Sequence, residues 1–249
     1  MTGPAERTQD GPPRGSYSTV SAAEIRRAST TGGIALLVLA VLAAFGHVGV
    51  VDRLIVEDDA VQTAADIADS ETLFRLGLAS LLVAAVLDIV VAWALFRVFE
   101  QVSSGLSMLT AWFRLAYAGI FVVAIAQLAG VLRLLPEVDA ADGEISAQVL
   151  SGVHAYEDTW RAGLVLFGVH LVLLAVLVYR AVFAPTILGI LLFIGGLSYL
   201  IDGFGDLLFA GYDVELARFT FLGELVLIFW LLLRGRRIAP SALSRTDHP

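Results

Sequence analysis

The chain has 249 residues, of which 58% are hydrophobic, and its mean hydropathy is +0.82. Soluble globular domains contain about 45–50% apolar residues, so this composition excludes that class and indicates a membrane protein. The formal net charge of −8 argues against nucleic-acid binding, which requires a basic surface. The absence of cysteine excludes thiol catalysis, thiolate metal ligands and disulfide bonds.

The chain begins with a polar segment and continues into six apolar stretches. Residues 1–28 are rich in Pro, Gly and Ser, so we expect a disordered N-terminal segment. A helix needs about 20 apolar residues to cross a hydrocarbon core about 30 Å thick. The stretches that meet or approach this length are Thr31–Val51, Leu73–Val98, Leu106–Leu135, Thr159–Tyr179, Thr186–Ala210 and Leu216–Leu233. We therefore predict a transmembrane domain over residues 29–235 and a flexible tail over residues 236–249.

Charged residues alternate between the segments that flank and join these stretches. Arginines border both ends of the domain and its second and fourth connections: Arg26, Arg27, Arg97, Arg180 and Arg234. Acidic residues fill the first, third and fifth connections. Because arginine is retained on the cytoplasmic side, both termini should lie in the cytoplasm. The sequence thus predicts an all-α bundle of six transmembrane helices, arranged as three hairpins in the cell membrane.

The two longer acidic connections are expected to be partly helical. Small and apolar residues around Ile67 permit a helix on the membrane surface, with Asp66, Asp69 and Glu71 facing water. In the second, Pro136 is expected to end the third span and to leave residues 139–143 irregular. Aromatic residues near the external ends of the spans are expected to form an interfacial belt: Tyr156, Trp160 and Tyr212.

Four ionisable residues are predicted to share one depth in the membrane. Counting about 1.5 Å per residue from the cytoplasmic ends of the helices places them about 13–15 Å deep, near the midplane. They are Asp88, Arg114, His170 and Glu224. A charge at this level costs about 2.5–3.5 kcal/mol unless it has a partner, a water-filled cavity or a function. Asp88 and Arg114 lie at equal heights on successive antiparallel helices, so we predict a buried ion pair between them.

Two interpretations of this midplane layer stay open. In the first, His170 and Glu224 form a hydrogen bond between helices, and the four residues only hold the bundle together. In the second, the layer is a proton-linked or polar-substrate site, since titratable groups at the midplane mark relays in transporters. We favour the structural interpretation.

A second charged layer is predicted nearer the external face. Its members are His47, Arg75, Arg161, Asp202, Asp206 and Arg218. Asp202 and Asp206 are four residues apart, so they share one face of a helix. Gly203 and Gly205 weaken that helix, and glycine-interrupted spans often mark binding sites in transporters. We favour a solvated charge network here over a ligand site.

A metal-dependent intramembrane hydrolase is a further alternative. Zinc accepts histidine and carboxylate ligands, and four residues would supply them at the external face: His47, His154, Asp202 and Asp206. The chain has only four histidines, and none is closely spaced to another. We therefore assign no catalytic residue, no metal and no other cofactor.

Several runs of residues resemble one family of membrane proteins. They are residues 163–180 (GLVLFGVHLVLLAVLVYR), 185–189 (PTILG), 196–202 (GLSYLID), 70–77 (SETLFRLG) and 223–230 (GELVLIFW). With these runs the sequence resembles a prokaryotic polytopic membrane family known only as domain of unknown function 4386. The resemblance implies an integral membrane protein over roughly residues 30–235 and no established activity.

We therefore expect a non-enzymatic multi-pass membrane protein of uncharacterised role, surrounded by the lipid bilayer and without a nucleic-acid partner. A transporter, or a bundle that binds a small polar ligand or lipid at the midplane, is the leading alternative.

Overall fold

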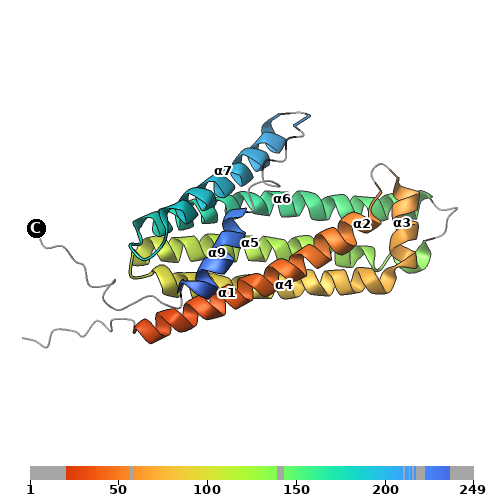
Figure 1. Cartoon of the computed structure of the whole chain (residues 1–249). Helices are drawn as coiled ribbons and strands as arrows, with labels where there is room; N and C mark the ends of the chain where they lie inside the picture. The colour runs from red at the N-terminus through yellow and green to blue at the C-terminus, as the bar shows by residue number, and fades with distance from the viewer. Residues whose placement is uncertain are drawn as a thin grey trace, which may run out of the picture.

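The computed structural model describes residues 21–56, 59–138, 143–209, 211–212, 214, 216 and 222–235. Within these residues every regular element is a helix, as Figure 1 shows. Five helices are long and apolar enough to cross a membrane. The all-α fold and the membrane character predicted from the sequence are therefore confirmed.

The helices are named here in chain order. They are α1 (Ala22–Ala44), the π-helical segment η1 (Phe45–Val51), α2 (Asp52–Leu54), α3 (Ala60–Asp69), α4 (Glu71–Phe99), α5 (Ser104–Val131), the short 3₁₀ helix η2 (Leu135–Glu137), α6 (Gly143–Arg180), α7 (Thr186–Leu208) and α9 (Leu222–Leu233). The first three follow one another without a break over Ala22–Leu54. The sixth predicted stretch is described only as α9, which has 12 residues, because residues 217–221 lie outside the described part. The structure thus has five candidate spans, and the sixth stays a prediction.

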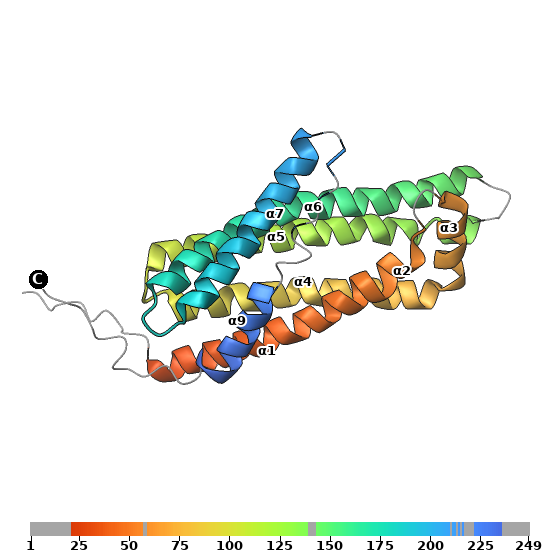
Figure 2. The same ribbon diagram turned by 45° about the horizontal axis from the view of Figure 1, so that its top comes forward.

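The long helices pack side by side in chain order. Figure 1 shows α4, α5 and α6 running nearly parallel, with α1 crossing them at a slant. Figure 2 shows α7 following α6 at one end and slanting away from it at the other. The short α9 packs on both α1 and α7, so it joins the first and last long helices of the bundle.

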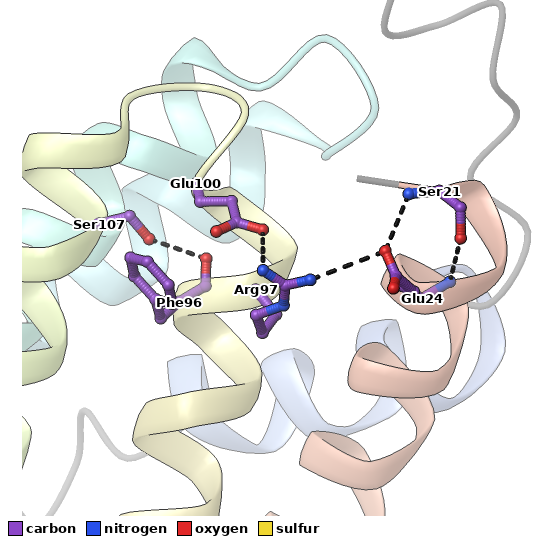
Figure 3. A network of polar contacts seen from close by, with 6 residues as sticks. All are labelled: Ser21, Glu24, Phe96, Arg97, Glu100 and Ser107. Carbon is purple, nitrogen blue, oxygen red and sulfur yellow. Dashed lines mark hydrogen bonds and ion pairs between the residues drawn. The ribbon is translucent and has the colours of Figure 1, made fainter. Parts of the chain in front are cut away.

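The first helix begins earlier than predicted. Ser21 caps α1, because its Oγ accepts a hydrogen bond from the Glu24 N–H (3.2 Å) while the Glu24 carboxylate accepts one from the Ser21 N–H (3.0 Å) (Figure 3). This capping box satisfies two amide groups that a helix start leaves free. Residues 22–28, which we expected to be disordered, are therefore helical; residues 1–20 and 236–249 lie outside the described part.

The same polar network fixes the start of α1 against the end of α4. Arg97, in the last turn of α4, forms ion pairs with Glu24 (3.7 Å) and Glu100 (2.8 Å). Beside it, the Ser107 hydroxyl of α5 donates a hydrogen bond to the Phe96 carbonyl (3.1 Å) (Figure 3). These contacts gather the ends of α1, α4 and α5 at the face where the sequence predicts the cytoplasm.

At the other end of the bundle, the acidic connections are more ordered than predicted. The helix expected around Ile67 is present as α3, but it packs against α6 with Ile67 fully buried. The third span ends close to the predicted residue, but Pro136 does not end α5, which stops at Val131, and lies instead within η2. The next helix, α6, begins at Gly143, well before the predicted Thr159. Residues 139–142 lie outside the described part.

Close helix crossings depend on glycine. A Cβ added at Gly168 of α6 would lie 2.8 Å from the Gly196 carbonyl oxygen of α7, and one added at Gly196 would lie 2.7 Å from the Gly168 carbonyl oxygen. Between α1 and α4, a Cβ at Gly32 would lie 2.8 Å from the Ala94 Cβ. Small residues let the backbones of membrane helices approach each other in this way.

Candidate functional site

An ion pair lies in the interior of the bundle between α4 and α5. Asp88 Oδ1 lies 2.5 Å from Arg114 Nη2, and the exposed fractions of the two side chains are 4% and 2%. This is the ion pair predicted from the equal heights of the two residues. Each charge would be costly alone in an apolar interior, and pairing offsets that cost.

A histidine from α6 completes the arrangement around Arg114. Nδ1 of His170 lies 2.9 Å from the Thr110 carbonyl oxygen, and its Nε2 lies 3.2 Å from Arg114 Nη1. A carbonyl only accepts and a guanidinium only donates, so Nδ1 carries the proton and Nε2 is the acceptor. His170 is therefore held as the neutral Nδ1–H tautomer. Phe167, one turn earlier, places its ring 5.4 Å from the guanidinium carbon of Arg114.

The predicted hydrogen bond between His170 and Glu224 is wrong. Both ring nitrogens of His170 are used by Arg114 and Thr110. Glu224, in the first turn of α9, instead accepts a hydrogen bond from the Tyr199 hydroxyl of α7 at 3.5 Å. The structure thus brings together three of the four midplane residues and gives the fourth a separate partner.

A cavity of about 230 Å³ lies beside this ion pair, between the faces of α1, α4, α5 and α6. We call it the Asp88 cavity, because Asp88 is the buried charged residue in its wall, whereas Arg114 does not line it. Most of the wall is apolar. Its larger side chains are His47, Tyr117, Phe121, Tyr156 and Trp160.

The aromatic side chains of the cavity wall are bonded to one another. The indole N–H of Trp160 donates to the Tyr117 hydroxyl (3.3 Å), and the Tyr156 hydroxyl lies 3.4 Å from His47 Nδ1. The His47 and Trp160 rings meet edge to face, with centroids 4.3 Å apart. Because these polar edges are engaged with each other, the wall is held in one arrangement.

A departure from regular helix geometry positions His47 in this wall. The chain forms a π-helix over Phe45–Val51, between α1 and α2. A π-helical turn changes the direction in which the following side chains point, and such turns are frequent at functional sites. Here the π-helical residue His47 reaches Tyr156 and Trp160 of α6, and its Nδ1 lies 3.6 Å from Asp52 Oδ1.

The predicted external charge layer is divided into separate contacts. Arg161 pairs with Asp206 (3.7 Å), Asp202 accepts a hydrogen bond from the Tyr212 hydroxyl (2.8 Å), and Arg75 pairs with Glu71 of its own helix (2.6 Å). His47 belongs to the Asp88 cavity, and Arg218 lies outside the described residues. Of the predicted members, the structure brings Arg161 and Asp206 together as an ion pair.

The alternative metal site has no support in the part of the chain that the structure describes. No group of three or more His, Asp or Glu residues there is arranged to hold a metal ion. All four residues of the hydrolase alternative are within that part: His47, His154, Asp202 and Asp206.

The aromatic wall is the feature that the sequence analysis missed. Tyr156 and Trp160 were expected in an interfacial belt, but Tyr156 is fully buried and both line the Asp88 cavity. The signal was their spacing, since Tyr156, Trp160, Phe167 and His170 recur at intervals that place them along one face of a helix.

Comparison with known proteins places the chain in a family. The model of the family "Domain of unknown function (DUF4386)" matches residues 31–235. The chain belongs to this family. The chain is also similar to an uncharacterized protein of Archaeoglobus fulgidus, with 34% identity over 154 residues, which cover 62% of this chain and 80% of the relative. No solved structure matches the chain.

Proposed function

We propose that this DUF4386 protein is a non-enzymatic, six-helix membrane protein that binds a small ligand in the Asp88 cavity. The observation that carries the proposal is a carboxylate only 3% exposed that nevertheless lines a cavity of about 230 Å³. Ligand sites in helical bundles lie between facing helices, with an apolar wall and a few polar groups. An ionisable residue within the membrane indicates a functional site by default.

A purely structural ion pair would not require this cavity. Protein interiors are closely packed, whereas this cavity opens to the surface beside Val48, which is 65% exposed, and reaches inward as far as Asp88. Leu81 and Ala84 of α4 line the cavity, so a larger residue at position 84 would fill part of it. We infer that the space is kept for a ligand, either a small molecule or part of a lipid.

The same proposal includes the placement of the chain in the cell membrane. Both termini are cytoplasmic, residues 216–233 form the sixth span, and the acidic connections are external. The Asp88 cavity then lies between the midplane and the external face, and it takes its ligand from the bilayer or from the outside.

Native mass spectrometry of the protein purified in a neutral detergent tests the proposal. The wild-type protein should retain a bound mass, and the variant Ala43→Leu should lose it, because Ala43 is a half-buried residue of the cavity wall. The matched control Ala79→Leu adds the same side chain at an exposed position of α4 outside the cavity. Identical spectra for the wild-type protein and Ala43→Leu would overturn the proposal.

A further inference from the structure

The chemistry of the Asp88 cavity limits the ligand that it can take. Its volume of about 230 Å³ lies below the range of about 300–1,000 Å³ common for drug-sized ligands. The cavity therefore fits a small molecule or the head of a larger one. Three features of its wall decide the charge of that group.

The first feature is the aromatic surface. Tyr117 and Phe121 of α5 stack with centroids 5.9 Å apart, and Tyr156 and Trp160 of α6 stack at 6.2 Å. Aromatic faces are negative and attract cations, most strongly when water is excluded. Groups of such rings recognise alkylated ammonium ions.

The second feature is the carboxylate of the ion pair. Asp88 lines the cavity, and its Oδ1 lies 2.5 Å from Arg114 Nη2, so its charge is balanced by Arg114. The third feature is that Arg114 does not line the cavity, and its guanidinium contacts His170 and the ring of Phe167, neither of which lines the cavity. A ligand in the cavity thus meets the carboxylate of the pair and aromatic faces, both of which disfavour an anion.

We propose that the Asp88 cavity binds an alkylated ammonium cation, either a free organic cation or the head group of a choline lipid. The cation lies against Tyr156 and Trp160, beside the ion pair, on the side where the carboxylate and not the guanidinium lines the cavity. This inference rests on the proposed ligand-binding function and adds the chemical class of the ligand.

The test compares probes of equal shape and different charge. Isotope-labelled choline is bound to the full-length protein in maltoside detergent by equilibrium dialysis. Its neutral isostere, in which carbon replaces the quaternary nitrogen, should compete at least about tenfold more weakly, because it lacks the attraction to aromatic faces and to a carboxylate. The anion pivalate should not compete. If lysophosphatidylcholine competes and lysophosphatidylglycerol does not, the bound cation is the head group of a lipid. If neither lipid competes, the bound cation is a free molecule.

Two matched variants locate the site. Trp160→Leu should weaken choline binding about tenfold, since it removes an aromatic face and keeps an apolar side chain, and Trp160→Phe should recover part of the loss. Trp112→Leu is the control, because Trp112 is 57% exposed and lies outside the cavity.

Equal competition by the neutral isostere, or equal binding by Trp160→Leu and Trp112→Leu, would overturn the cationic ligand. The native mass spectrum of Ala43→Leu decides separately whether the cavity binds any ligand at all.

Discussion

Arg114 is among the largest of the fully buried side chains in the described part of the chain. Its guanidinium is held by a carboxylate, a neutral imidazole and an aromatic ring, contributed by α4 and α6. Arginine suits this position because its planar head offers several donors at fixed angles, which a lysine ammonium does not. The arginine thus joins three helices through one side chain, and removing any of its partners should have a measurable cost.

The first prediction concerns the ion pair. Asp88→Asn should lower the free energy of unfolding by about 3–5 kcal/mol, because it leaves the buried Arg114 without its counter-charge. Replacing both Asp88 and Arg114 with leucine should cost less than Asp88→Asn alone, since no buried charge is then left unpaired. Thermal unfolding in detergent micelles measures both. A double variant less stable than Asp88→Asn would contradict the prediction.

The second prediction concerns the histidine tautomer. His170→Phe keeps an aromatic ring but removes the acceptor for Arg114 and the donor to Thr110, so it should destabilise the bundle by about 1–3 kcal/mol. His170→Gln retains an acceptor and a donor and should lose less. Thermal unfolding measures both variants, and nitrogen-15 NMR of the wild-type protein should show the proton on Nδ1. A proton on Nε2 would refute the assigned tautomer.

The sequence predicted the Asp88–Arg114 contact but not the partner of His170. Equal distance from a shared turn can be counted along two consecutive helices, so the height of Asp88 matched that of Arg114. Which residue His170 faces depends on the rotation of α6 about its axis and on which helices are neighbours. Depth alone gives neither of these. The predicted partner of His170 was therefore Glu224 of α9, whereas its actual partners, Arg114 and Thr110, are in α5.

At the scale of the helices, the glycines at the crossing of α6 and α7 set the distance between the two backbones. Gly168 and Gly196 each lie so close to the carbonyl oxygen of the other that a Cβ has no space. Backbone atoms cannot move aside as the end of a side chain can. The two helices would therefore have to separate to admit any other residue.

The third prediction follows from this crossing. Gly196→Ala should destabilise the protein by about 1–3 kcal/mol, because overpacking forces α6 and α7 apart. The control is Gly119→Ala in α5, where an added Cβ has no neighbour within 4 Å, and this change should be neutral or stabilising because alanine favours a helix. Thermal unfolding measures the melting temperatures of both variants. Equal melting temperatures for the two would show that the crossing tolerates a side chain.

The number and extent of the helices were only partly readable from the sequence. The apolar stretches identified five spans because length and hydropathy are sufficient to recognise a membrane helix. The π-helix at Phe45–Val51 and the extension of α6 to Gly143 were missed. Both depend on packing between helices, which hydropathy does not report: η1 brings His47 against α6, and α3 packs on α6.

At the scale of the whole molecule, the polar network around Arg97 and the Asp88 cavity lie at different levels of the bundle. The network ties α1 to the turn between α4 and α5, and Ser29 of α1 also donates a hydrogen bond to the Leu231 carbonyl of α9 (2.9 Å). Toward the other end, α7 slants away from α6 (Figure 2). The bundle is thus closed at the end where α1 begins, and the cavity lies farther from that end.

The last prediction tests the topology through the sixth span. The described α9 is 12 residues long, about 18 Å, but residues 216–233 as one helix would reach about 27 Å, close to the hydrocarbon thickness. A fluorescent-protein fusion at the C-terminus should therefore fluoresce, as it does only in the cytoplasm, and an alkaline phosphatase fusion there should be inactive. Fusions at Ser103 should behave in the same way, while those at Asp59 and Asp142 should give the opposite pattern. The result depends on whether the number of spans is even or odd, because five spans would place the two termini on opposite sides of the membrane. An active phosphatase at the C-terminus together with a cytoplasmic N-terminus would show that residues 216–233 do not cross, and would remove the proposed six-helix topology.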